Sequence, residues 1–501
     1  MTNDALNPAI PDCASTGIEG LDDILNGGLP RNHLYLVEGD PGTGKTTMAL
    51  QFLLAGIKAG EKALYVTLSE SKRELEEVAI SHGWNVSDLP IFEMTPSEEQ
   101  LTPEAQYTVF HPSDVELSDT TNAVLEQVDK IGPKRVVFDS LSELRMLARE
   151  PLRYRRQILA LKQYFAGRKC TVLLLDDRTA SEDDSQLQSI AHGVVMLQSL
   201  GREFGIKRRR LEVRKMRGSR YREGFHDFSI ETGGVRVYPR LVAAEHLPGF
   251  QRKLVGSGIP ALDAIFSGGI HSGTSTLLMG PAGCGKSTIA MQYACAAAQR
   301  GERAVLFSFD ETRETMLERA RGLEMELDSF IESGRVIVQQ IDPAEISPGE
   351  FVSRVRNFAE HEGTTLIVID SLNGLLNAMP GEEFLLLQLH ELLSYLNQRG
   401  MATFMTLAQS GIVGSQMSSP VDVSYLADSV LLFRYFEAGG AVRQALSVVK
   451  KRTGAHERTI RELTLGTNGI AVGRALTEFE GILTGIPRFS GSLEKLKPSV
   501  S

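Results

Sequence analysis

A glycine-rich pattern, GxxxxGK followed by Ser or Thr, occurs twice in this chain of 501 residues. The copies occupy residues 39–46 and 280–287, and Lys286 lies 241 residues after Lys45. Backbone N–H groups of such a loop bind phosphate where a strand runs into it and a helix leaves it. With the threonine after each copy, the predicted nucleotide-binding residues are Gly39, Asp40, Pro41, Gly42, Thr43, Gly44, Lys45, Thr46 and Thr47, and Gly280, Pro281, Ala282, Gly283, Cys284, Gly285, Lys286, Ser287 and Thr288. Two loops in a chain of this length predict two domains.

The sequence around the loops repeats as well. A Thr-Gly-Ile start at residue 16 and a Ser-Gly-Ile start at residue 257 are again 241 residues apart, and a glycine pair follows each. An apolar segment suited to a strand leads into each loop, and one suited to a helix follows and ends at Gly60 or Gly301. The predicted strands are 34–38, 63–68, 136–139 and 170–175, then 275–279, 304–309, 366–370 and 402–407, and the two helices are 47–59 and 288–299. Alternating strands and helices predict an α/β fold with a mainly parallel, helix-flanked sheet in each repeat.

Aspartates that end apolar strands are the predicted metal ligands. Asp139 and Asp370 are 231 residues apart, so the first repeat is longer by about ten residues, which we assign to a surface loop within the polar segment 95–120. In a nucleotide site of this kind, the hydroxyl after the lysine and a strand-end aspartate meet Mg²⁺. The predicted metal-binding residues are Thr46, Asp139, Ser287 and Asp370.

Glutamates at the end of a neighbouring strand are the predicted catalytic residues. Glu70 and Glu311 are 241 residues apart, and Asp310 precedes the second of them. Alone, each would be an ordinary solvated side chain, but the matched spacing favours a catalytic role. A carboxylate there can orient and deprotonate a water molecule against a γ-phosphate. We therefore expect a nucleoside triphosphate and Mg²⁺ as cofactors, and the resemblance described below implies that the nucleotide is ATP.

Composition narrows the class of protein. The chain has 42% hydrophobic and 23% charged residues, as soluble globular proteins do, and no apolar run long enough to span a membrane. Residues 1–11 do not resemble a secretion signal, and the four cysteines have no CxxC spacing, so we expect a cytoplasmic protein. Its net charge of −10 argues against a nucleic-acid partner. We interpret Cys284 as a small residue that fits the loop, in preference to a redox-sensitive group.

The predicted domains are residues 12–241 and 254–480. They are joined by a linker of mixed polarity, 242–253, and followed by a tail, 481–501, rich in Gly, Pro, Ser and Lys. Such a composition predicts a flexible or partner-binding tail. A basic segment, 207–222, has three interpretations: a solvated edge strand, a nucleic-acid patch, or charges that reach a nucleotide held by a neighbouring subunit.

This ordered series of motifs resembles the KaiC family of double-domain ATPases over about residues 12–473. The resemblance implies that each half has a recombinase-like P-loop core and that the chain forms a homohexameric, two-tiered ring with ATP between neighbouring subunits. The family's paired catalytic glutamates correspond to Ser69 and Glu70 and to Asp310 and Glu311. Ser69 has no carboxylate, so slow ATP hydrolysis in the first half would depend on Glu70.

The resemblance also implies residues that act across subunit boundaries. Lys215 and Arg217, and less closely Lys450 and Arg452, match family residues that reach a neighbour's γ-phosphate. Clock members phosphorylate an adjacent Ser-Thr pair in the second half, and the matching residues here are Ser424 and a tyrosine. Ser424 is therefore the candidate phosphoacceptor, without an ordered two-site cycle. The tail has no match to the segment that clock members use to engage their activating partner.

Our leading hypothesis is a cytoplasmic, homohexameric ATPase that holds its ring together with ATP in the first half and has serine autokinase activity in the second. A small regulatory partner protein or a signalling kinase is implied by the resemblance alone. One alternative is a recombinase- or helicase-like DNA-binding ATPase, for which residues 207–222 would supply phosphate contacts. Another is a nucleotide-gated scaffold without either activity.

Overall fold

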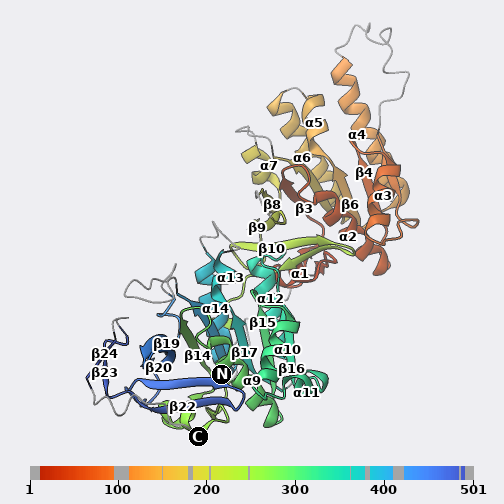
Figure 1. The fold of residues 1–501 in the computed structure, drawn as a ribbon. Coiled ribbons are helices and arrows are strands. Elements are labelled where there is room, and N and C mark those ends of the chain that lie inside the picture. Colours follow the sequence, from red (N-terminus) through yellow and green to blue (C-terminus); the bar gives the residue numbers. More distant parts are fainter. Residues whose placement is uncertain are drawn as a thin grey trace, which may run out of the picture. The chain divides into compact units, whose positions relative to one another are not determined.

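Each half of the chain is built on a nine-stranded sheet with helices packed against both faces (Figure 1). The structure is a computed structural model that describes residues 12–94, 112–148, 150–178, 184–201, 205–245, 249–361, 363–377, 384–409, 423–483 and 487–490. The chain divides into two units, Met1–Arg240 and Leu241–Ser501. Among the described residues, no helix is both long and apolar enough to cross a membrane.

The first unit alternates strands and helices up to its last four strands. Its strands are β1 (Cys13–Ala14), β2 (Leu29–Pro30), β3 (Leu34–Gly39), β4 (Ala63–Thr67), β5 (Ile91–Glu93), β6 (Arg135–Asp139), β7 (Thr171–Asp177), β8 (Gly193–Leu200), β9 (Arg208–Met216), β10 (Phe225–Glu231) and β11 (Gly234–Tyr238). Its helices are α1 (Glu19–Ile24), α2 (Lys45–Lys58), α3 (Lys72–Ser81), α4 (Pro112–Ile131), α5 (Leu141–Ala148), α6 (Pro151–Arg168) and α7 (Asp184–Ile190).

The second unit follows the same plan. Its strands are β12 (Leu254–Val255), β13 (Ile270–His271), β14 (Thr274–Gly280), β15 (Arg303–Ser308), β16 (Val336–Gln340), β17 (Thr364–Asp370), β18 (Ala402–Ala408), β19 (Ser429–Ala438), β20 (Ala441–Lys451), β21 (Arg461–Gly466), β22 (Gly469–Ala475), β23 (Phe479–Glu480) and β24 (Arg488–Phe489). Its α-helices are α8 (Pro260–Ile265), α9 (Lys286–Gln299), α10 (Arg313–Gly322), α11 (Leu327–Glu332), α12 (Pro348–Glu360), α13 (Leu372–Asn377) and α14 (Leu385–Gln398), and a short 3₁₀ turn, Ala243–Glu245, precedes them.

The two sheets have the same topology. Their strand orders, β11-β10-β9-β8-β3-β7-β6-β4-β5 and β22-β21-β20-β19-β14-β18-β17-β15-β16, correspond one to one. The strands from β8 to β5 and from β19 to β16 pair in parallel, and the remaining three of each sheet pair antiparallel. The predicted α/β fold with a mainly parallel sheet in each half is confirmed. The glycine loops leave β3 and β14, which lie inside the parallel part of each sheet.

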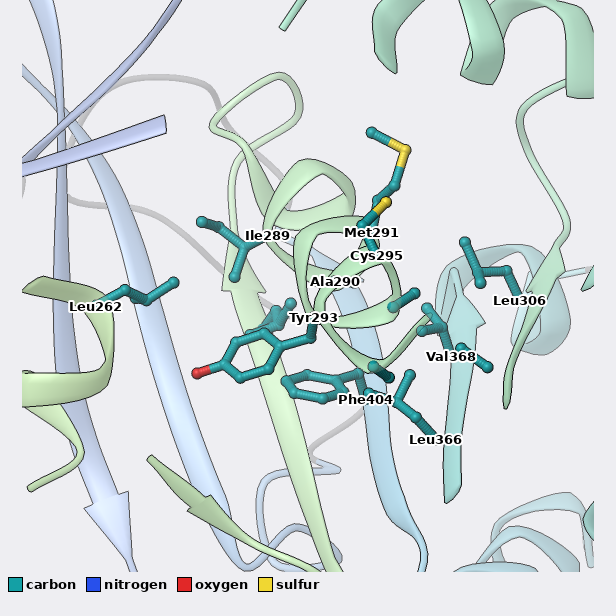
Figure 2. Close-up of a cluster of buried hydrophobic side chains, with 14 of the residues drawn as sticks. Leu262, Ile289, Ala290, Met291, Tyr293, Cys295, Leu306, Leu366, Val368 and Phe404 are labelled. Carbon is teal, nitrogen blue, oxygen red and sulfur yellow. The ribbon is translucent and has the colours of Figure 1, made fainter. Parts of the chain in front are cut away.

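Parallel strands covered on both faces bury most of their side chains, which is why the central strands are largely apolar in sequence. In the second sheet, Leu306, Leu366 and Val368 face α9, and the alternate residues Val305 and Ile367 belong to the cluster that contains α12 and α14. Figure 2 shows the α9 side, where the ring centroids of Tyr293 and Phe404 are 4.5 Å apart. The first sheet is divided in the same way between α2 on one face and α4 and α6 on the other.

The predicted strands and both predicted helices are present with small shifts at their ends. Two interpretations were wrong. Residues 112–120, assigned to a surface loop, open α4, whose Val124 and Val128 are buried at helical spacing, and residues 95–111 lie outside the described residues. The basic strand β9 is not an edge strand, because β8 and β10 pair with it on both sides.

The segments at the predicted boundaries are partly packed. Leu241 and Ala243 lie in the core cluster of the second unit, and the backbone N–H of Ala243 donates to Glu391 at 2.9 Å. The first residues of the predicted linker 242–253 therefore pack on the second unit. In the predicted tail 481–501, β24 pairs with β23, while residues 484–486 and 491–501 lie outside the described residues.

Candidate nucleotide sites

The two glycine loops have the same backbone conformation. Gly42 and Gly44 have φ angles of 77° and 101°, and Gly283 and Gly285 have 75° and 98°. A Cβ atom at Gly44 would lie 2.6 Å from Ile230 of β10, and one at Gly285 would meet Leu465 of β21 at 2.8 Å. Glycine is therefore required both for the left-handed backbone and for the close approach of these strands. Each loop opens the first turn of a 14-residue helix, where free N–H groups attract phosphate.

In the first site, the P-loop lysine is held by its own loop and by an acid. Lys45 Nζ donates to the carbonyls of Gly39 at 2.7 Å and Asp40 at 3.1 Å, and it lies 2.8 Å from Asp177 Oδ1 at the end of β7. The lysine is only 8% exposed. Its charge is thus directed into the loop and is already paired.

The second lysine has different neighbours. Lys286 Nζ donates to the Pro281 carbonyl at 2.7 Å and lies 3.8 Å from Cys284 Sγ. Cys284 is fully buried, and burial raises the pKa of its thiol despite the nearby lysine. A raised pKa disfavours the reactive thiolate, which is consistent with a small residue that fits the loop.

The predicted metal ligands of the first site lie together. Thr46 Oγ1 donates to Asp139 Oδ2 at 3.0 Å, and the hydroxyl of Tyr65 on β4 donates to the same oxygen at 2.6 Å. Burial raises the pKa of the Asp139 carboxyl, and these two hydrogen bonds and Lys45 oppose that rise. A threonine hydroxyl beside a strand-end carboxylate provides the few protein ligands that Mg²⁺ uses beside nucleotide phosphates.

Glu70 lies at the same edge of the sheet. Its backbone is fixed by Thr67, whose hydroxyl accepts from the Glu70 N–H at 3.0 Å and donates to the Glu70 carbonyl at 2.6 Å. Its Oε2 atom is buried without a hydrogen-bond partner among the described residues. Burial raises the pKa of the Glu70 carboxyl, and Asp139 and Glu74 add to the rise. A partly buried carboxylate with a raised pKa suits a general base.

In the second site, the acidic pair is divided between two partners. Asp310 accepts a short hydrogen bond from Ser371, and Glu311 Oε2 accepts from Arg319 Nη2 of α10 at 2.7 Å. Burial raises the pKa of Glu311, Arg319 lowers it, and Asp370 raises it again. Asp370 itself accepts a short hydrogen bond from Thr406 of β18.

A cavity of about 400 Å³ lies against the second loop. It is lined by Gly283, Gly285, Lys286, Ser287, Thr288, Arg319, Gly322, Leu323 and Leu465. Loop N–H groups, a lysine and two hydroxyls line one part, and leucines line another. A phosphate group and a flat apolar base both fit such a lining, so the residues present suit ATP.

The four cations that the resemblance assigns to a neighbour's nucleotide are tied to backbone carbonyls within their own unit. Lys215 Nζ donates to Gln188 at 2.6 Å and Ala191 at 2.8 Å, and Arg217 Nη2 donates to Ser189 at 2.9 Å. In the second unit, the same kind of bond fixes the loop before β19.

There, Lys450 Nζ donates to the carbonyls of Ser424 at 2.9 Å and Ala427 at 2.7 Å, and Arg452 Nη2 donates to that of Tyr425 at 2.9 Å. A shift in strand register lies next to each lysine, between Val194↔Lys215 and Val195↔Val213 in one sheet and between Val430↔Lys450 and Leu431↔Val448 in the other. The two lysines therefore occupy equivalent places, although the residues after Arg452 depart from the family pattern.

Tyr65, Asp177 and Arg319 are among the residues that contact predicted site residues and were missed from the sequence. Tyr65 lies in an apolar strand predicted only as core, Asp177 lies beyond the end of the predicted strand 170–175, and Arg319 lies on a helix with no motif. An acid at the carboxyl end of a strand could have indicated Asp177, because the loop lies at that edge. Tyr65 and Arg319 carry no such signal.

Comparison with known proteins agrees with this geometry. The KaiC ATPase family model matches the chain twice, over residues 14–242 and 255–477. The chain belongs to the KaiC ATPase family. It is 27% identical over 481 residues to a circadian clock oscillator protein KaiC of Acaryochloris marina, covering 94% of this chain and 90% of the relative. It is also 27% identical over 511 residues to the circadian clock protein KaiC2 of a Synechocystis species, covering 99% of this chain and 87% of the relative.

Proposed function

We propose that this KaiC-family chain binds MgATP at both loops, hydrolyses it slowly in the first unit and transfers phosphate to Ser424 in the second, as a homohexameric ring. When bound, ATP supplies the phosphoryl group and Mg²⁺ offsets its charge. Thr46 and Asp139, and Ser287 and Asp370, would hold the metal. The relatives are named circadian clock proteins. From those names we infer only a regulatory role for this chain, controlled by a small partner protein or a signalling kinase.

In the first unit, the chain's own groups support hydrolysis. The loop and Lys45 would bind and orient phosphate oxygens, and within the described part of the chain Glu70 Oε2 has no hydrogen-bond donor that an attacking water would have to displace. Because Ser69 cannot assist, a single carboxylate would have to position and deprotonate the water. General-base catalysis by one positioned group contributes about 10²- to 10⁴-fold, which is compatible with slow turnover.

In the second unit, one observation carries the kinase proposal: the proposed trans-acting cations are hydrogen-bonded to the backbone at Ser424. Lys450 binds the Ser424 carbonyl and Arg452 the next carbonyl along the chain. If these cations reach a neighbour's γ-phosphate, they bring the Ser424 hydroxyl to the same place. Glu311 or Asp310 of that neighbour would take the hydroxyl proton.

Mapping of label from γ-labelled ATP tests this proposal. We expect label on Ser424 that is absent from Ser424→Ala and reduced by about 10²-fold or more in Glu311→Gln. Tyr425→Phe is the matched control and should retain the label. ATP hydrolysis without incorporation into the chain would refute the kinase part and leave the ATPase.

Ring assembly is tested separately. Light scattering should show a hexamer with MgATP and smaller species after its removal, and Lys215→Met should weaken assembly because the first site would lose a trans-acting charge. A hexamer that persists without nucleotide would contradict ATP-dependent assembly.

The DNA-binding alternative is less favoured, because basic residues of β9 are engaged within the first unit. Arg210 Nε donates to Gln198 at 2.8 Å and its guanidinium lies over the ring of Phe225, while Arg214 pairs with Glu212 at 3.4 Å. Phosphate contacts need clustered free charge. Strong stimulation of ATP hydrolysis by single-stranded DNA would nevertheless favour this alternative over the autokinase.

A further inference from the structure

The ion pair between Lys45 and Asp177 distinguishes the first nucleotide site from the second. Asp177 ends β7, the strand next to β3, and its Oδ1 lies 2.8 Å from Lys45 Nζ. Lys45 is nearly buried, while Asp177 is about one-third exposed. Two loop carbonyls already accept hydrogen bonds from Lys45 Nζ, and the carboxylate lies on the remaining side of the ammonium group.

Within the part of the chain that the structure describes, the second site has no such acid. Strand register pairs Gly39 with Asp177 and Gly280 with Ala408, so alanine stands where the first unit has aspartate. The next backbone N–H, that of Arg178 or Gln409, donates to the corresponding glycine carbonyl in each unit, which supports this equivalence. Among the described residues, no carboxylate lies within ion-pair distance of Lys286.

We propose that Asp177 is an internal competitor of the nucleotide at the first site. A phosphate that binds Lys45 has to displace the Asp177 carboxylate, and the displaced carboxylate remains close to the incoming negative charge. Both effects weaken ATP binding, because the ion pair is lost and like charges approach in a partly desolvated site. Asp177 acts through Lys45 and is thus a positioning residue.

This inference rests on the proposed function, since it gives the first site a regulatory property. If ATP between subunits joins the first tier of the ring, Asp177 raises the ATP concentration at which the ring assembles. Assembly would then respond to ATP supply.

Two reciprocal variants test the proposal in the full chain. With the second loop disabled by Lys286→Ala, Asp177→Asn should bind a fluorescent ATP analogue about tenfold more tightly, because a lost charge-assisted bond of this kind changes affinity by that order. With the first loop disabled by Lys45→Ala, Ala408→Asp should weaken binding at the second site by a similar factor. The ATP midpoint for hexamer assembly should fall in Asp177→Asn.

The outcomes separate this inference from the proposed function. Unchanged or weaker binding in Asp177→Asn would overturn the competitor role, as would a loss of turnover of about 10²-fold without tighter binding, which would make the carboxylate a catalytic group. Ala408→Asp decides the question if Asp177→Asn fails to fold. Absence of ATP-dependent assembly in the unmodified chain would instead refute the ring proposal. Asp129→Asn, a change of the same kind at an exposed ion pair with Arg168, serves as the control.

Discussion

Replacing Tyr65 by phenylalanine tests how the first site holds its metal ligand. Among the described residues, two hydroxyls donate to Asp139 Oδ2, Tyr65 at 2.6 Å and Thr46 at 3.0 Å. Asp139 is 5% exposed, so solvent has little access to replace a lost donor. A hydrogen bond to a charged group contributes about 2 kcal/mol, which corresponds to about 30-fold in an equilibrium constant. Outer hydrogen-bond partners of metal ligands change metal affinity by a comparable factor of about 10 to 100.

The assay is ATP hydrolysis at the first site as a function of Mg²⁺ concentration, in a Lys286→Ala background. We expect the apparent Mg²⁺ constant of Tyr65→Phe to rise by about 10- to 30-fold, because Asp139 is less well oriented and its pKa rises further. Tyr35→Phe is the matched control: its hydroxyl donates to the Pro30 carbonyl at 2.6 Å, away from the metal ligands. An unchanged Mg²⁺ constant in Tyr65→Phe, or an equal shift in Tyr35→Phe, would refute the reasoning.

Three further predictions concern pH. Hydrolysis at the first site should be lost as pH falls through the raised pKa of Glu70, because this carboxyl must be ionised to act as a base. Glu70→Gln should lower kcat by about 10²- to 10⁴-fold at every pH. If the acid limb of the pH–rate profile survives in Glu70→Gln, it belongs to another group. Arg319→Met should raise the pKa of Glu311, because the effects of burial and Asp370 would no longer be opposed. The acid limb of the second site should therefore move to higher pH by about one unit. A pH–rate profile in a Lys45→Ala background measures this shift. Burial lowers the pKa of His226 to about 4, below its unfolded value of 6.5, so the unfolded chain takes up the proton first and stability falls as pH drops from 6.5 towards about 4. At about pH 5 the loss of stability is on the order of 2 kcal/mol. Thermal unfolding should therefore depend less on pH in His226→Gln than in the unmodified chain.

The His226 prediction follows from fixed hydrogen bonds. Nδ1 accepts from the backbone N–H of Arg240 at 2.8 Å, so Nε2 carries the proton and faces the Arg222 carbonyl at 3.0 Å. A second proton on Nδ1 would meet a donor. The neutral ring is thus the form that the first unit accommodates.

Local sequence determined the two phosphate loops and the elements around them. A glycine at a left-handed position, an apolar strand before it and a helix after it are properties of neighbouring residues, so Gly44 and Gly285 could be placed without knowledge of the fold. The same holds for Asp139 and Asp370, which end strands that are buried on both faces. Composition gave a wrong prediction for residues 112–120 of α4, because their polar character suggested a surface loop.

Only the tertiary structure decided which side chains meet at each loop. The strand order β3-β7-β6-β4 places β7 beside β3 and β4 beside β6. Tyr65 therefore contacts Asp139 across 74 residues of chain, and Asp177 contacts Lys45 across 132. The same pairing leaves Ala408 beside the second loop and ties Lys450 to Ser424. Such contacts depend on hydrogen bonding between distant strands, which no pattern of adjacent residues records. The repeat of 241 residues therefore predicts two alike sites, and the packing around their lysines makes them different.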